Sequence, residues 1–197
     1  MKLPKKPVLL TAAAVVALLT VTGCSPDAPA DGATAAQEVD VLAKLGLDGV
    51  TGRALVDELE ATPLEDRRDE FIASVRADHV VVTDLETERE TTVPLPEDEF
   101  YLSIAPYVSR THPCGFHSLT TCVGELRSAE LDVTIVDDAG ATVFEGAVTT
   151  QGNGFAGLWL PRDITGRITV EYDGRSATGP VSTGADAETC ETDLELA

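Results

Sequence analysis

The spacing of apolar residues changes near Asp78, and this change constrains the fold of the 197-residue chain more than any other feature. Before Asp78 apolar residues recur every three or four positions, as in helices, and after it they alternate with polar residues, as in strands. Strands are expected at residues 80–82, 91–95, 100–104, 131–136, 142–148, 155–160 and 168–172. Turn signals such as Gln151-Gly152-Asn153-Gly154 separate several of them. The pattern favours an α+β fold, with a small N-terminal helical region before a mainly antiparallel, sandwich-like β domain.

Three helices are expected in the N-terminal helical region, residues 37–77. Residues 38–45 form an apolar-periodic run that ends at Gly46, and Thr51 is a candidate N-cap for a second helix through Leu59. The sequence Thr62-Pro63-Leu64-Glu65 is a capping box with proline at the first helical position, so a third helix is expected through about Arg76. The β-rich domain then occupies residues 78–197. The single tryptophan and the phenylalanines are expected in the core.

The first 23 residues have the organisation of a signal peptide. Three lysines precede an apolar stretch at residues 8–21, and Val21-Thr22-Gly23-Cys24 has the small-residue pattern of a cleavage site that ends in cysteine. The pattern resembles the lipobox of bacterial lipoproteins, which implies cleavage before Cys24 and lipidation of its sulfur. A non-cleaved anchor is the alternative, but the apolar stretch is shorter than the roughly 20 residues of a spanning helix. We expect an extracytoplasmic protein, lipid-anchored to the outer face of a bacterial membrane.

Composition and charge limit the partners of the mature chain. Residues 24–36 are rich in small and polar residues with almost nothing to bury, so a flexible tether is expected there. Loss of the three lysines in residues 1–23 leaves 11 basic against 34 acidic residues, a net charge of −23. Such a field disfavours nucleic acid and anionic lipid and favours cations and basic protein surfaces. Membrane contact is therefore expected only through the lipid anchor.

Reactive side chains gather in residues 111–122, Thr-His-Pro-Cys-Gly-Phe-His-Ser-Leu-Thr-Thr-Cys. Cys114 and His117 are three positions apart, a spacing that one turn places on the same side, and Cys122 can return to them across the loop. Cys190 lies far off in the sequence, just before the apolar alternation of Leu194 and Leu196. A final strand could carry it back to the loop. The candidate metal ligands are Cys114, His117, Cys122 and Cys190.

Thiolates and imidazole are soft donors, which favour Cu(I) and Zn(II) over Mg(II), Ca(II) or Mn(II). Structural zinc sites usually place cysteines two to four residues apart, whereas 7 and then 67 residues intervene here, so copper is favoured and zinc is the alternative. Two thiols can also give one electron each to Cu(II), which leaves a disulfide and Cu(I). In an exported chain the default for Cys114 and Cys122 is a plain disulfide, but that leaves Cys190 unexplained.

The segment from His112 to Leu126, His-Pro-Cys-Gly-Phe-His-Ser-Leu-Thr-Thr-Cys-Val-Gly-Glu-Leu, resembles the CueP family of bacterial periplasmic copper-binding proteins. The later residues Thr189-Cys190 and Leu194-Glu195-Leu196 belong to the same resemblance, which extends from about Gly46 to the end of the chain. The lipoprotein tether is where this chain departs from the soluble periplasmic members.

The resemblance implies that copper is bound through three cysteines and a histidine, here Cys114, Cys122, Cys190 and His117. It also implies roles in copper tolerance, in the reduction of Cu(II) and in the supply of copper to an exported cuproenzyme such as Cu,Zn superoxide dismutase. The fold that it implies has a small N-terminal domain that mediates dimerisation and a larger β-rich domain that bears the site. A homodimer is therefore an expectation that only the resemblance supplies.

Roles follow for the four candidate ligands. Cys114 and Cys122 are the expected redox couple, Cys190 is the third sulfur, and His117 is the nitrogen ligand or the group that assists deprotonation of a thiol. Reduction of Cu(II) by these thiols would be stoichiometric unless an external reductant resets the disulfide. Whether the chain is an enzyme therefore stays open.

The remaining histidines and two other functions complete the expectations. His112 precedes Pro113, which favours an extended conformation that turns it away from Cys114, and His79 is expected at a strand end. A thiol-disulfide oxidoreductase is one alternative, although the Cys-x-x-Cys motif of such enzymes is missing. A disulfide-stapled interaction module is the other.

Overall fold

The computed structural model describes residues 41–197. The expected signal peptide, the lipidated Cys24, the tether and the start of the first helix lie outside these residues. The described part of that helix, residues 41–45, is helical, and Gly46 follows in a turn with a φ of 69°. Within residues 41–197 no helix has the length and apolar character that crossing a membrane requires.

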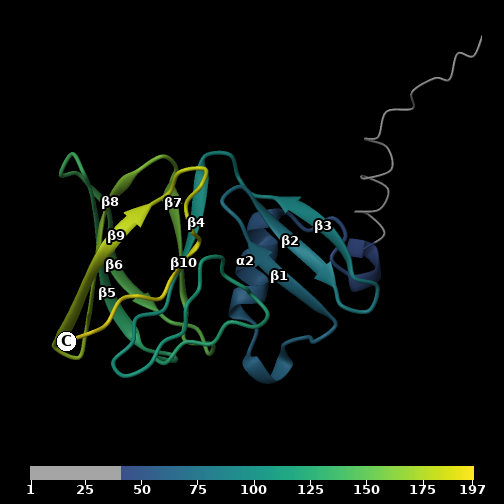
Figure 1. Ribbon diagram of the computed structural model, residues 1–197, viewed down its shortest axis with the longest axis horizontal. Coiled ribbons are helices and arrows are strands. Elements are labelled where there is room, and N and C mark those ends of the chain that lie inside the picture. Colours follow the sequence, from purple (N-terminus) through teal and green to yellow (C-terminus); the bar gives the residue numbers. More distant parts are fainter. Residues whose placement is uncertain (1–40) are drawn as a thin grey trace, which may run out of the picture. The chain divides into compact units, whose positions relative to one another are not determined.

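The second expected helix is confirmed as α2, Gly52–Ala61. The Thr51 side chain caps it by accepting a hydrogen bond from the backbone N–H of Ala54. Leu55 and Val56 form its buried face and pack in one core with β1 (Phe71–Val75), β2 (His79–Asp84) and β3 (Arg89–Pro94). These strands form an antiparallel sheet in the order β1-β2-β3 (Figure 1).

The prediction of a third helix through Arg76 is wrong. Only Leu64–Asp66 forms a short 3-10 turn, and the residues after it form β1. Phe71, Ala73 and Val75 are buried whereas the residues between them are partly exposed, so the true period is two. The helix was expected because Phe71 and Val75 are also four positions apart. Since β1 pairs with β2, one sheet crosses the boundary that was expected between residues 77 and 78.

The rest of the described chain forms two further sheets with a shared core. In the first, β4 (Glu99–Ile104) pairs antiparallel with β7 (Ala156–Pro161) and parallel with the two-residue β10 (Cys190–Glu191). The second sheet is antiparallel in the order β6-β5-β8-β9, with the strands Thr142–Thr149, Glu130–Asp137, Thr165–Tyr172 and Arg175–Ser182. Phe100, Leu131 and Ile168 are among the residues of the core. The sheets are mostly antiparallel and the helical part is small, as predicted.

Several details differ from the expectations. β9 was not predicted because Gly179 and Pro180 interrupt its pattern, but proline is tolerated at the edge of a sheet, where β9 lies. Trp159 is only half-buried, with its ring under the Arg53 guanidinium at 4.6 Å and its indole N–H bonded to Asp57. Phe116 is 47% exposed and is not a core residue.

Candidate metal centre

The reactive segment lies in the long loop between β4 and β5, which β1 holds in place. The Val75 N–H donates to the His117 carbonyl at 2.8 Å, and the Leu119 N–H donates to the Ala73 carbonyl at 2.9 Å. Thr189, just before β10, holds the same loop: its hydroxyl oxygen accepts from the His117 N–H at 3.1 Å and donates to the Val75 carbonyl at 2.9 Å. These bonds fix the backbone of His117 between β1 and the start of β10.

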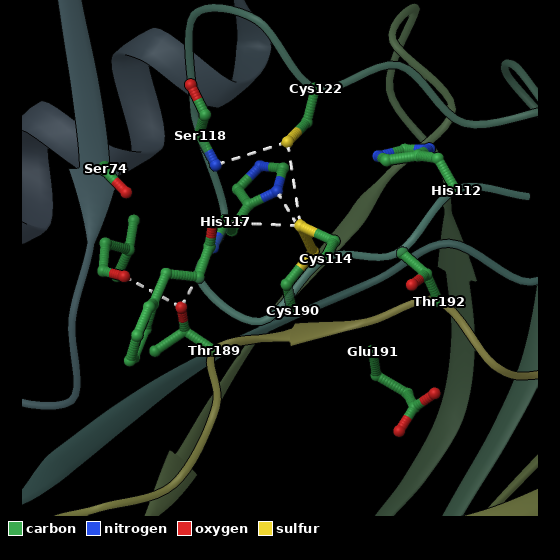
Figure 2. The surroundings of a disulfide bond; sticks show 12 residues. Ser74, His112, Cys114, His117, Ser118, Cys122, Thr189, Cys190, Glu191 and Thr192 are labelled. Atoms are coloured by element: carbon green, nitrogen blue, oxygen red, sulfur yellow. Dashed lines mark hydrogen bonds between the residues drawn. A yellow bond between two sulfur atoms is a disulfide. The ribbon is translucent and has the colours of Figure 1, made fainter.

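Three sulfur atoms meet beside this loop (Figure 2). Cys114 and Cys190 form a disulfide, and Sγ of the free Cys122 lies 3.8 Å from Sγ of Cys114. Cys190 reaches the loop because it pairs with Ser103 of β4, which places its Cα 5.6 Å from that of Cys114, a spacing that suits a disulfide. The bonded pair therefore differs from the expected couple of Cys114 and Cys122, with Cys190 in the place of Cys122.

The imidazole of His117 is fully buried and held at both nitrogens. Its Nε2 lies 2.7 Å from Oε2 of Glu60, and its Nδ1 lies 3.9 Å from Sγ of Cys190. Glu60, near the end of α2, is 4% exposed and also accepts hydrogen bonds from the Tyr101 hydroxyl at 2.7 Å and the Asn153 amide at 2.6 Å. Metal-binding histidines usually have one nitrogen fixed by a carboxylate in this way while the other faces the metal.

Burial and charge oppose each other in this cluster. Burial lowers the pKa of His117, but the Glu60 carboxylate and the Cys122 sulfur outweigh burial and raise the pKa to about 9. Burial raises the pKa of Glu60, but His117 and the other two donors outweigh it, so that pKa lies below its ordinary value. Burial also raises the pKa of the Cys122 thiol. The hydrogen bond and charge of His117 lower that pKa by more, so the net shift is downward. The structure thus favours the charged forms of all three groups.

Cys122 has two further donors near it. The Ser118 N–H donates to its sulfur at 3.4 Å, and Nη1 of Arg67 donates to its backbone carbonyl at 2.9 Å. Nε and Nη2 of Arg67 are buried and have no hydrogen-bond partner among the described residues. A sulfur beside an imidazole and a backbone N–H has the surroundings of a reactive thiolate.

His112 faces the sulfurs, so the expectation that Pro113 turns it away is wrong. A nitrogen of its ring lies within 4.8 Å of the sulfurs of Cys114 and Cys122, and Figure 2 shows the ring directed toward them. His79 stands at the first position of β2, hydrogen-bonded to the aspartate before it, which confirms its place at a strand end.

Sequence reasoning missed the residues that surround the ligands, chiefly Glu60, Arg67, Tyr101, Asn153 and Thr189. One signal was present, because Glu60 follows Val56 by four positions and therefore lies on the apolar face of α2. An acidic residue on such a face is buried only when it has partners. The other residues lie in separate segments that only the tertiary fold brings together.

The donor set fits a soft metal ion. Ligand atoms about 2.0–2.3 Å from a metal lie about 3.5–4 Å apart. This agrees with the 3.8 Å between the sulfurs of Cys114 and Cys122 and the 3.9 Å between Cys190 Sγ and His117 Nδ1. The disulfide must be reduced before Cys114 and Cys190 can offer thiolates. The fold and site define a β-rich protein in which cysteine and histidine side chains can hold a soft metal ion.

Comparisons with known proteins identify the family of the chain. The profile of the family described as periplasmic copper-binding protein CueP matches residues 54–195. A solved structure titled "Crystal Structure of S.CueP" is 38% identical, with a TM-score of 0.74, and the match covers 81% of this chain and 97% of that chain. No curated protein matches the chain. The chain belongs to the CueP family of periplasmic copper-binding proteins, so it acts outside the cytoplasm.

Proposed function

We propose that the reduced chain binds Cu(I) through the sulfurs of Cys114, Cys122 and Cys190 and through Nδ1 of His117. The observation that carries the proposal is the convergence of three sulfurs and one buried imidazole, at contact distances of 3.8–3.9 Å, in a member of a copper-binding family. Sulfur and imidazole donors suit Cu(I), and zinc is the alternative metal. Glu60 supports the site by holding the ring so that Nδ1 faces the sulfurs.

The cysteines also reduce Cu(II). The thiols of Cys114 and Cys190 give one electron each to two Cu(II) ions, release two protons and form the disulfide, so that two Cu(I) ions result. The bonded pair in the structure supports Cys114 and Cys190 as the couple, in place of Cys114 and Cys122. Cys122 and His117 stay available to retain one Cu(I). The reaction stops after one round unless an external thiol reductant reopens the disulfide.

In the cell this chemistry serves copper tolerance and the supply of Cu(I) to an exported cuproenzyme, such as a Cu,Zn superoxide dismutase. A lipid on Cys24 keeps the protein at the outer face of the membrane, and a homodimer forms through the N-terminal part. The description of the family supports the copper role, and the net charge of −23 in residues 24–197 favours partners with a basic surface.

A titration of the reduced chain with Cu(II) tests this function. Free thiols and a coloured Cu(I) chelator are followed together without oxygen, in a Cys24→Ser chain so that only the three site thiols react. We expect about two thiols to disappear as two Cu(I) form, with one Cu(I) retained. In a Cys190→Ala chain the bond between Cys114 and Cys190 cannot form and one sulfur ligand is lost, so the Cu(I) affinity of the reduced chain should fall. Thiols that disappear without retained copper, or that never react, would contradict the proposal.

Two other functions draw on the same sulfurs. Thiol-disulfide exchange is favoured by the free Cys122 thiol, whose sulfur lies 3.8 Å from the disulfide sulfur of Cys114. A structural staple is favoured by the disulfide itself, which joins residues 76 positions apart. Cys122→Ala separates these functions: it abolishes exchange, leaves a staple intact, and weakens Cu(I) binding only if the metal proposal holds.

A further inference from the structure

Cys114 belongs to two groups of three potential metal ligands. The inner triad comprises Cys114, His117 and Cys190, and the outer triad comprises His112, Cys114 and Cys122. Within each triad all donor atoms lie within 4.8 Å of one another. The sulfur of Cys114 belongs to both, so a metal ion bound in one triad already contacts a ligand of the other.

The two triads differ in their access to solvent. In the inner triad His117 is 0% and Cys190 is 5% exposed. In the outer triad all three residues are half-buried, and His112 lines an open cavity of about 220 Å³ beside Arg110 and Gly124. Cys114 and Cys190 line a second cavity of about 230 Å³, but His117 does not line it and is fully buried, so an ion that arrives from solvent meets the imidazole of His112 before that of His117.

The two imidazoles are also held differently. Nε2 of His117 is bonded to Glu60, and its ring centroid lies 4.5 Å from that of Phe155. The His112 side chain has no hydrogen bond within residues 41–197, and its ring makes an edge contact with Phe155 at 6.2 Å between centroids. An imidazole with no polar partner that is directed at two sulfurs, as Figure 2 shows, has a lone pair available for a metal ion.

We infer that His112, Cys114 and Cys122 form an outer copper position that binds the ion first, and that the ion reaches the inner position by ligand exchange on the shared Cys114 sulfur. His117 and Cys190 bind the ion in turn as His112 leaves it, while Cys114 and Cys122 stay bound, so the transfer ends at the four-ligand site proposed above. This inference rests on the proposed function of the reduced chain as a Cu(I)-binding protein, and it adds a ligand and a direction of transfer to it.

Variants that lack one cysteine separate the two positions. Cys190→Ala keeps the outer triad and Cys122→Ala keeps the inner one, and alanine suits both places because the sulfurs pack against Ala105 and Phe155. The reduced chains are titrated with Cu(I) against a coloured chelator, and X-ray absorption counts the nitrogen and sulfur ligands. Trp159 fluorescence confirms that each variant is folded.

We expect a different histidine to matter in each cysteine variant. In the Cys190→Ala chain, adding His112→Ala lowers Cu(I) affinity by about tenfold or more and removes a nitrogen ligand, whereas adding His117→Gln has a much smaller effect. In the Cys122→Ala chain the effects exchange, so that His117→Gln weakens binding and His112→Ala does not. His79→Ala is the matched control, because that histidine is hydrogen-bonded at a strand end, and it should change nothing in either chain.

The outcomes distinguish the inference from the function on which it rests. If the Cys190→Ala chain retains Cu(I) and His112→Ala has no effect on it, the outer position is refuted while the proposed function stands. If the chain with all three cysteines retains no Cu(I), the proposed function itself fails. Rapid-mixing kinetics give a second measurement that needs no cysteine variant: His112→Ala alone should slow Cu(I) uptake and leave the final affinity unchanged. An equal rate would refute the order of binding.

Discussion

Replacing Glu60 by glutamine tests whether the buried carboxylate organises the site. Oε2 of Glu60 accepts hydrogen bonds from the Tyr101 hydroxyl and from His117, and Oε1 accepts from the Asn153 amide. Glutamine has the same shape, but one of its two polar atoms is a donor. The substitution therefore leaves the packing unchanged and alters only the charge and one acceptor.

The expected change in the free energy of unfolding follows from these three hydrogen bonds. If the oxygen of the glutamine takes the place of Oε2, the amide nitrogen of the glutamine faces the amide nitrogen of Asn153. Asn153 cannot turn its oxygen toward the glutamine without losing the bond that this oxygen accepts from the Phe155 N–H at 2.9 Å. One bond to a charged group is then lost, at about 1.5–3 kcal/mol. The other two become bonds to a neutral group, which are roughly half as strong. Because a buried charge is also removed, we expect the free energy of unfolding to fall by about 3 kcal/mol.

Urea unfolding of the metal-free, disulfide-bonded chain, followed by Trp159 fluorescence, measures this loss. Glu58→Gln is the matched control, since Glu58 is exposed on the same helix and should change stability by less than about 0.5 kcal/mol. In the reduced chain Glu60→Gln should also lower Cu(I) affinity by about tenfold or more, because a weaker bond to a neutral group then orients the His117 ring. A cost below about 1 kcal/mol together with unchanged Cu(I) affinity would refute this role for Glu60.

Three further predictions concern the surroundings of the site. Thr189→Val removes a buried acceptor and a buried donor, so the free energy of unfolding should fall by about 2 kcal/mol in urea titrations. The Ser109 hydroxyl and nearby backbone N–H groups lower the pKa of Glu125 to about 2 from 4.5. The ionised carboxylate therefore stabilises the fold above pH 4.5, and this stabilisation is lost as the pH falls toward 2. The difference in thermal midpoint between the unchanged chain and Glu125→Gln should shrink between pH 5 and pH 3. Reduction of the bond between Cys114 and Cys190 should lower stability by about 4 kcal/mol, because 76 positions separate them, and Cu(I) should restore part of it.

Most of the β domain could be predicted from the sequence because several of its strands alternate between buried and more exposed residues. β5, Glu130–Asp137, is an example, with Leu131, Val133 and Ile135 buried and polar residues between them. β1 was mistaken for a helix because a five-residue run with four apolar residues fits both periods. Pairing with β2 decides between them, and a strand partner is not a local property of the sequence.

The candidate ligands could be named from the sequence, but their pairing could not. Cys114, His117 and Cys122 lie within nine positions and soft-donor chemistry singles them out. The disulfide between Cys114 and Cys190 depends on the parallel pairing of β10 with β4, which joins residues about 90 positions apart. His112 was placed wrongly because a conformational bias at one residue does not fix where its side chain points in a long loop.

The position of the sulfurs relates the redox state of the site to the attachment of the C-terminal segment. β10 is two residues long, and the segment around it is also held by backbone bonds from Ser103 to Thr189 and from Ala105 to Glu191 and by the buried Leu194 and Leu196. In the oxidised chain the disulfide joins β10 to the long loop between β4 and β5. When that bond is reduced, a Cu(I) ion bound to both Cys114 and Cys190, as we propose, would supply the same connection. The segment therefore has a covalent link to the loop in the oxidised state and, by the proposed function, a metal link in the Cu(I)-bound state, each in addition to its backbone bonds. The reduced, metal-free state holds it least, which is also the state in which Cys190 is freest to accept an ion from the outer position.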